Sequence, residues 1–233
     1  MRGMPRHRLL ITACAVLVLL TSCSKKNDNA GSDLPAGDSL LSAAAQQMRD
    51  LKTTKFLITA DTPIAGLALR RAEGSLTREG SAQGSAQVEQ LGANVELTFV
   101  IVGDSIYLKG PTGGYQRLPL ALASTIYDPS AMLDPDRGIA KVLTTGKNAK
   151  TQARETIDGR DTYRVAATFD GAVLATILPG AKGEVPGKAW IGTDPKHLIK
   201  AAFTLPAASG GNPGTATITF SAFDEPVNIS APV

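Results

Sequence analysis

The chain has 233 residues, of which 43% are hydrophobic and only 5% aromatic, and its formal net charge is +3. Residues 1–22 supply the whole basic excess, because they hold three arginines and no acidic residue, and the rest of the chain has 21 basic and 21 acidic residues. A neutral chain gives no reason to expect a nucleic-acid partner.

The N-terminus has the pattern of a secretory leader. Three arginines, the last at Arg8, precede the uncharged run Leu9–Leu20. That run has about a dozen residues, whereas a membrane-spanning helix needs roughly 20. A basic start followed by a short apolar core is typical of a signal peptide that is removed from the mature protein.

The end of the apolar run, Leu20-Thr21-Ser22-Cys23, resembles a lipobox, the cleavage site of bacterial lipoprotein precursors. The resemblance implies that residues 1–22 are a lipoprotein signal peptide and that Cys23 becomes the mature N-terminus, carrying a thioether-linked diacylglycerol. The alternative is an ordinary signal peptide that happens to contain a cysteine. Residues 23–37 are then an acylated cysteine with a polar, flexible tether, and residues 38–233 form a single domain.

Residues for catalysis or metal binding are scarce. Cys14 leaves with the leader and Cys23 would be alkylated, while His197 is the only histidine outside the leader. A zinc site would need ligands besides His197, and a Ser-His-Asp triad would have to use it. The simpler interpretation of His197 is a surface residue at the start of a strand. No nucleophile or nucleotide-binding motif is present. We therefore predict no catalytic residue, no metal site and no cofactor.

The first element of the domain is predicted to be an amphipathic helix over residues 38–52. Leu41, Ala44 or Ala45, Met48 and Leu51 recur at helical spacing, and Asp38 or Ser39 is suited to cap the first turn.

Four later runs alternate apolar and polar residues with a period of two, as strands with one covered face do. They span residues 82–89, 94–101, 162–169 and 216–222. Asp158-Gly159, just before the third run, predicts a tight hairpin.

Short helices are expected between these strands. Asp128-Pro129 and Asp134-Pro135 each combine a capping residue with a proline suited to the first helical position. Gly146 is suited to end a helix there, and Asp170 is suited to cap a second helix that Pro179 stops. The predicted class is α+β, a curved antiparallel sheet with short helices packed on its concave face.

One face of the run 82–88 is lined with small residues, namely Ala82, Gly84, Ala86 and Val88. Small groups opposite apolar helices leave room for a ligand, but they also allow helices to approach a sheet closely. Composition alone leaves both interpretations open.

Four segments together resemble the LppX/LprA/LprF/LprG family of actinobacterial lipoproteins, its LprG-like members most closely. They are "IYDPSAMLDPDRGIAKVL" at 126–143, "ARETIDGRDTYRV" at 153–165, "VPGKAWI" at 185–191 and "ITFSAFDEPVNISAP" at 218–232. The resemblance covers the chain from the lipobox to the C-terminus, with the segments in the same order.

The resemblance implies a half-barrel sheet wrapped over helices, with an apolar cavity between them that binds multi-acylated envelope lipids. LprG-like members take triacylated glycolipids and triacylglycerol and are linked to a major-facilitator exporter. Carried over by position, the cavity residues are Ala86, Val88, Val95, Leu97 and Phe99 on the sheet and Ile126, Leu133, Ile139, Val142, Leu143, Val173, Leu174 and Ile177 on the helices.

Three functions remain distinct at this stage. The favoured one is a monomeric, non-enzymatic lipid carrier, anchored through Cys23 to the outer face of the cell membrane. The second is an adaptor of an envelope export complex that carries no lipid. The third is a hydrolase that uses His197, which requires a serine and a carboxylate beside it.

Overall fold

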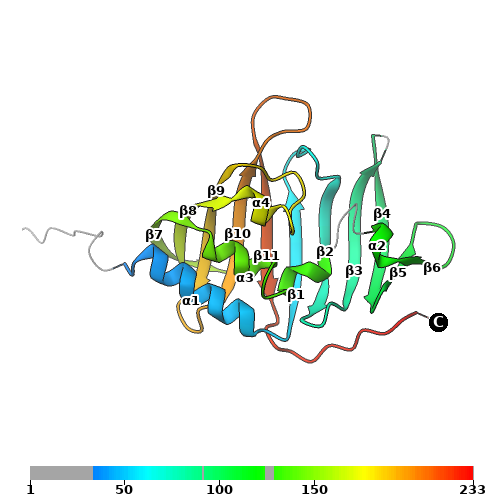
Figure 1. Ribbon diagram of the computed structural model, residues 1–233, viewed down its shortest axis with the longest axis horizontal. Coiled ribbons are helices and arrows are strands. Elements are labelled where there is room, and N and C mark those ends of the chain that lie inside the picture. The colour runs from blue at the N-terminus through cyan, green and yellow to red at the C-terminus, as the bar shows by residue number, and fades with distance from the viewer. Residues whose placement is uncertain (1–33, 91, 124–128, 233) are drawn as a thin grey trace, which may run out of the picture. The chain divides into compact units, whose positions relative to one another are not determined.

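The computed structural model describes residues 34–90, 92–123 and 129–232. Within them, eleven strands form one antiparallel sheet in the order β6-β5-β4-β3-β2-β1-β11-β10-β9-β8-β7 (Figure 1). The strands are β1 Thr53–Ala60, β2 Leu69–Thr77, β3 Ala82–Gln90, β4 Ala93–Val102, β5 Ser105–Lys109, β6 Gln116–Pro119, β7 Lys147–Ile157, β8 Arg160–Asp170, β9 Glu184–Gly192, β10 Leu198–Leu205 and β11 Gly214–Ser221. The helices are α1 Gly37–Asp50, α2 Leu120–Ala123, the 3-10 helix η1 Pro129–Leu133, α3 Ile139–Thr144 and α4 Gly171–Leu174.

The sheet consists of two runs of neighbouring strands, β1–β6 and β7–β11. They are joined by the antiparallel pairing of β1 with β11, in which Lys55 lies opposite Ser221. The four predicted strands are present as β3, β4, β8 and β11. The predicted hairpin is also present, because Asp158 and Gly159 connect β7 to β8 with φ angles of 49° and 75°, the left-handed values that a two-residue type I′ turn requires.

The helices lie on one face of the sheet, which we call the inner face (Figure 1). Helix α1 packs on β7–β10 and on α3, while α3 and α4 contact β8. Helix η1 contacts β2, and α2 lies beside β5 and β6. The predicted α+β class, an antiparallel sheet with short helices on one face, is confirmed.

Helix α1 forms for the predicted reason but begins differently. Its apolar stripe, which includes Leu41 and Met48, is buried. The predicted cap at Asp38 or Ser39 is wrong, since Ala36 occupies the cap position without any side-chain hydrogen bond. A Cβ atom on Gly37 would lie 2.7 Å from the carbonyl carbon of Ala149 in β7, so close packing against the sheet determines where this helix starts.

The two described aspartate caps behave differently, while Asp128 lies outside the described residues. Asp170 caps α4 as predicted, accepting hydrogen bonds from the amides of Ala172 and Val173 at 2.8 and 3.2 Å. The helix ends at Leu174, before Pro179. Asp134 caps a turn instead of a helix, because α3 begins only after Gly138.

Candidate functional site

The inner face of the sheet has two halves that differ in burial. Under α1, α3 and α4, the inward side chains are sealed, with Val165 and Ala189 at 0% exposure and Ala201 at 1%. This half is a close-packed core, in which neighbouring side chains fill the space between helices and sheet.

The other half, on β3–β5, keeps apolar side chains that are only half-buried. Ala86 and Val88 of β3 lie opposite Leu97 and Val95 of β4, and all four have intermediate exposure. Leu108 of β5 is also half-buried. We call these five residues the open apolar face. Helices α1, α3 and α4 make their described sheet contacts with the sealed half, so these three helices do not cover the open apolar face.

A row of residues beside the open apolar face contains two glycines. Phe56, Gly74, Gly84 and Phe99 are consecutive partners across β1, β2, β3 and β4. A Cβ atom on Gly84 would lie 2.0 Å from the backbone oxygen of Glu73, so a side chain does not fit there. No side chain therefore separates Phe56 from Phe99 along this row.

The structure places the proposed cavity residues in two groups. The sheet group, Ala86 to Phe99, shares one face of β3 and β4. The helix group belongs to η1, α3, α4 and the turn after α4. Val173 of this group is half-buried. The other described members are at most 2% exposed, namely Leu133, Ile139, Val142, Leu143, Leu174 and Ile177. The helix group and, from the sheet group, Ala86, Val88 and Phe99 belong to or pack against one continuous hydrophobic core, which does not include Val95 and Leu97. Ile126 and Cys23 lie outside the described residues, and the assignment of all these residues to a lipid cavity stays a prediction.

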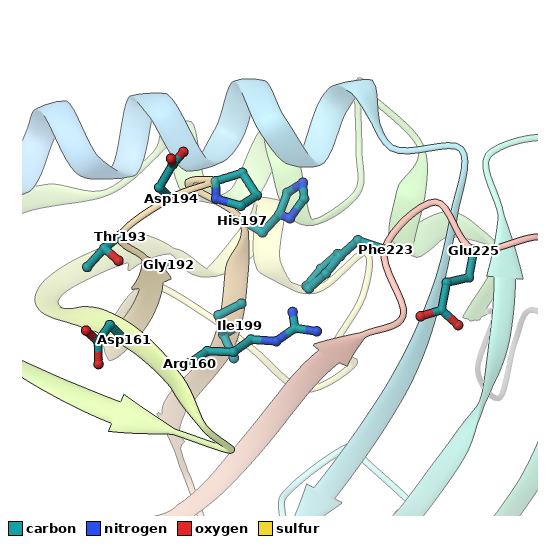
Figure 2. Close-up of a pocket in the computed structure, with 10 residues that line it drawn as sticks. Arg160, Asp161, Gly192, Thr193, Asp194, His197, Ile199, Phe223 and Glu225 are labelled. Carbon is teal, nitrogen blue, oxygen red and sulfur yellow. The ribbon is translucent and has the colours of Figure 1, made fainter.

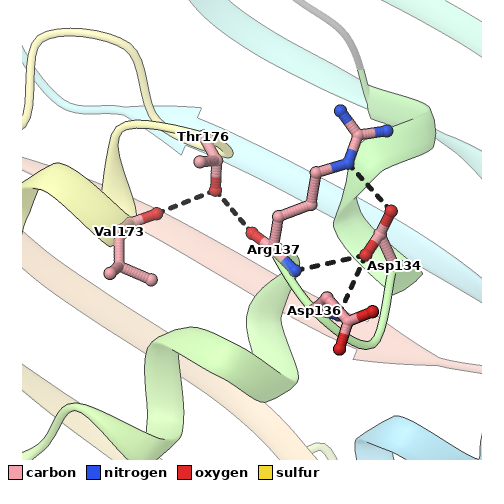
Figure 3. A network of polar contacts seen from close by, with 5 residues as sticks. All are labelled: Asp134, Asp136, Arg137, Val173 and Thr176. Carbon is pink, nitrogen blue, oxygen red and sulfur yellow. Dashed lines mark hydrogen bonds and ion pairs between the residues drawn. The ribbon is translucent and has the colours of Figure 1, made fainter.

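The segment before α3 is tied to the segment after α4 by polar contacts (Figure 3). The Thr176 hydroxyl shares its single proton between the Arg137 carbonyl at 2.5 Å and the Val173 carbonyl at 2.8 Å. Arg137 in turn donates through Nε to Asp134 at 2.8 Å. Partial burial acts to raise the pKa of Asp134, but the hydrogen bonds from Arg137 and from two backbone amides outweigh it and lower that pKa. The helical segments on the inner face are thus linked to each other as well as to the sheet.

A second site is a polar surface pocket of about 400 Å³ beside His197 (Figure 2). His197 has intermediate exposure at this surface pocket and directly precedes β10, in agreement with the expected surface position at the start of a strand. Burial lowers the pKa of its imidazole, the charge of Arg160 lowers it further, and Asp224 opposes both. Neither serine nor cysteine is among the described residues that line this pocket, and its one hydroxyl group belongs to Thr193.

In the part of the chain that the structure describes, no group of three or more His, Cys, Asp or Glu side chains is placed to hold a metal ion. Among the same residues, no helix has the length and apolar character needed to cross a membrane.

Comparison with known proteins identifies the family. The model of the LppX_LprAFG lipoprotein family matches residues 36–229. The chain belongs to this family. A relative within it, the lipoarabinomannan carrier protein LprG of Mycolicibacterium smegmatis, is 31% identical over 96% of this chain and 93% of the relative. The protein of the same name from Mycobacterium tuberculosis is 29% identical over 100% of this chain and 99% of its own length.

Solved structures of the LppX_LprAFG family share the fold. LprF from Mycobacterium bovis superimposes with a TM-score of 0.73 at 26% identity, covering 84% of this chain and 96% of LprF. LppX from Mycobacterium tuberculosis superimposes with a TM-score of 0.62 at 22% identity, covering 82% of this chain and 98% of LppX. The open antiparallel sheet with a few short helices is therefore the family's architecture, and the resemblance found in the sequence is confirmed.

Proposed function

We propose that this protein is a lipid carrier of the cell envelope that holds acyl chains against the open apolar face. The observation that supports this most directly is the half-burial of Val95 and Leu97 next to a sealed core. Apolar side chains that a folded protein leaves partly exposed on one contiguous face indicate a place where an apolar partner is bound. The carrier name given to the LprG relatives supports the same function.

The physical basis of binding is the transfer of acyl chains out of water. Burial of each methylene group contributes about 0.8 kcal/mol, so even a chain of a dozen carbons is held without specific polar contacts. A face covered incompletely on one side also lets the chain leave again, which a carrier requires. The residues of this face are apolar and select for acyl chains, not for a headgroup.

The finer points of the proposal come from the family. The ligand is a triacylated glycolipid or triacylglycerol, the protein acts as a monomer with a major-facilitator exporter, and Cys23 anchors it to the outer face of the cell membrane. The protein performs no catalysis in this proposal.

The decisive experiment is mass spectrometry of lipids bound to the full exported chain purified from an actinobacterial host. An acylated glycolipid or triacylglycerol in stoichiometric amount is the expected result. Purified protein without lipid, and with no uptake of these lipids on incubation, would leave the adaptor as the better account.

A further inference from the structure

The edge of the sheet formed by β6 exposes large apolar side chains. In the part of the chain that the structure describes, these are Tyr115 at 38%, Leu118 at 37% and Leu122 at 64% exposure. All three lie within eight residues of sequence, around β6 and α2. Such a local group is more than the scattered apolar residues that every protein surface carries.

This edge continues the apolar surface of the inner face. Ile101 of β4 lies opposite Ile106 of β5, and Ile106 lies opposite Leu118 of β6. The exposed fraction rises along this row from 0% to 5% to 37%. The row beside it runs from Phe99 to the half-buried Leu108. Leu118 therefore extends the face that we propose to hold acyl chains. Arg117, which pairs with Tyr107, and Tyr115, which lines a pocket with Gln83 and Ser85, lie on the other face of the same edge.

The segment that forms the edge carries basic charges only, while two acidic residues lie beside it: the Asp104 carbonyl accepts from the Leu120 amide at 2.9 Å, and Glu73 lines the same surface pocket as Tyr115. Between Lys109 and Leu122 the sequence contains two basic residues, Lys109 and Arg117, and no acidic residue. The Lys109 ammonium lies 5.9 Å from the centre of the Tyr115 ring, and Arg117 Nε donates to Ser105 at 3.0 Å. Leucine, an aromatic ring and basic groups together are the composition of segments that lie at the boundary between lipid headgroups and acyl chains.

We propose that Tyr115, Leu118 and Leu122, with Lys109 and Arg117, form a rim that inserts into the surface of an anionic phospholipid bilayer. The leucines enter the acyl-chain boundary, and the two cations lie against phosphate groups. A lipid then passes between the bilayer and the open apolar face along the row from Leu118 to Ile106. The inference rests on the proposed carrier function and adds the surface from which the lipid is exchanged.

The rim lies far from the N-terminal end of the domain, which explains why it would need its own contact with the bilayer. The chain enters the described part of the structure beside β7, where the Thr151 hydroxyl donates to the carbonyl of Pro35 at 2.5 Å. Strands β7 and β6 are the opposite edges of the sheet (Figure 1). At about 4.8 Å between neighbouring strands, roughly 48 Å of sheet separates them. Attachment through the N-terminus alone does not hold the β6 edge at a bilayer, so that edge needs membrane affinity of its own.

The test places an environment-sensitive fluorophore on single introduced cysteines in the full exported chain. Leu122→Cys reports on the rim, and Thr204→Cys, exposed on β10, is the matched control. The chain without an added cysteine measures any labelling at Cys23. On vesicles of equal phosphatidylglycerol and phosphatidylcholine, the Leu122→Cys label is expected to shift to the blue and to be quenched by spin-labelled acyl chains. The Thr204→Cys label is expected to remain in water.

Two further comparisons isolate charge and exchange. Arg117→Gln is expected to reduce the preference of the rim label for phosphatidylglycerol over pure phosphatidylcholine vesicles. Leu122→Asp is expected to slow lipid uptake from vesicles roughly tenfold, the loss expected when one leucine no longer enters an apolar layer. Uptake of the same lipid from detergent micelles, which needs no bilayer contact, is expected to slow less.

Two outcomes would overturn the proposal. One is a rim label that stays in water, or that responds no more than the Thr204→Cys label. The other is an equal slowing of uptake from vesicles and from micelles. The first outcome does not depend on the carrier proposal, whereas the second requires a protein that takes up lipid. If the unmodified protein binds no lipid from either source, the carrier proposal fails and the position of the rim label alone tests the membrane contact.

Discussion

The imidazole of His197 stacks on the ring of Phe223, with ring centroids 4.3 Å apart and planes inclined by 23°. The guanidinium of Arg160 lies 5.2 Å from the centre of the same ring (Figure 2). The next residue, Asp224, accepts a hydrogen bond from the amide of Lys52 at 2.7 Å. The segment that follows β11 is thus held against the sheet by this aromatic ring, by the Asp224 carboxylate and by hydrogen bonds that join Thr53 to Asp224 and Glu225.

This stack predicts a loss of stability in mild acid. The folded pKa of His197 lies below its ordinary value of 6.5, chiefly because the imidazole is partly buried. The unfolded chain therefore takes up a proton first, and the stabilisation present above pH 6.5 is lost as the pH falls from there through the folded pKa. The free energy of unfolding, measured by denaturant titration, is expected to decrease as the pH falls below 6.5 through the folded pKa of His197.

His197→Phe is the control for this prediction, because it keeps a ring against Phe223 and removes the proton site. Its unfolding free energy should be flatter over the same interval. The aspartates with lowered pKa, Asp61, Asp134 and Asp161, lose their contributions only as the pH falls below 3.8, outside this window. An equal slope for both proteins would contradict the assignment.

Ala86→Trp tests whether the open apolar face holds lipid. Ala86 is half-buried, so an indole there is expected to occupy the place of an acyl chain and to reduce bound lipid strongly with little loss of stability. Ala72, its neighbour across β2 and β3, is 1% exposed. Ala72→Trp is therefore expected to overpack the core, at a cost of about 1–3 kcal/mol.

Lipid content by mass spectrometry and the midpoint of thermal unfolding are measured together for both variants. Delipidated protein is used for the melting curves, because bound ligand itself raises apparent stability. If Ala86→Trp melts as poorly as Ala72→Trp, or retains its full load of lipid, then Ala86 does not face the ligand.

Gly84→Ala tests the glycine row between Phe56 and Phe99. The added methyl group would lie 2.0 Å from the Glu73 oxygen, a backbone atom that cannot turn aside. We expect the variant to lose about 3 kcal/mol of stability, at the upper end of the range for overpacking. Gly110→Ala is the matched control, since its methyl group would meet no atom within 4 Å, and its stability should change by less than about 1 kcal/mol. Similar stabilities for the two variants would show that β2 and β3 can separate at this point.

Thr176→Val tests the link between the helical segments (Figure 3). The substitution keeps the shape and removes the hydroxyl that donates to Arg137, so stability should fall by about 1 kcal/mol. Thr144→Val is the matched control, because the hydroxyl that it removes donates only within its own helix, to the carbonyl of Lys141. Hydrogen exchange is expected to quicken around both α3 and α4 in Thr176→Val. A change limited to α4 would mean that the two segments are independent.

Cys23→Ala tests the anchor. If the lipobox is used, this variant should incorporate no radiolabelled fatty acid in an actinobacterial host, whereas Cys14→Ala should incorporate it normally. Labelling that persists in Cys23→Ala, or that disappears in Cys14→Ala, would place the modification elsewhere.

Strict alternation was sufficient to predict the strands around Val95 and Val165, because one side of each faces the core and the other faces water. Strand β6 escaped prediction since all four of its residues are exposed, and no burial pattern remains in its sequence. Strand β9 escaped because its last residues, Ala189 to Gly192, are buried on both faces. Period-two reasoning detects only half-covered strands.

The candidate site was predictable only in part, for a similar reason. The small face of 82–88 was visible in the sequence, but the difference between sealed Ala72 and half-buried Ala86 arises from strands and helices distant in sequence. Leu118 and Leu122 were not identified because only short helices were expected between the predicted strands. The signal that could have found them is the run of apolar residues around Arg117 without an acidic residue.

The pairing of β1 with β11 also orders the biogenesis of the protein. The hairpins of β1–β6 and of β7–β10 can form from neighbouring residues, but the two halves become one sheet only when the last strand is available. Closing so long a loop between chain ends is slow compared with hairpin formation. A polypeptide that emerges with its C-terminus last thus stays incomplete until β11 is available. The topology delays the joining of the two halves of the sheet until the last strand has been delivered.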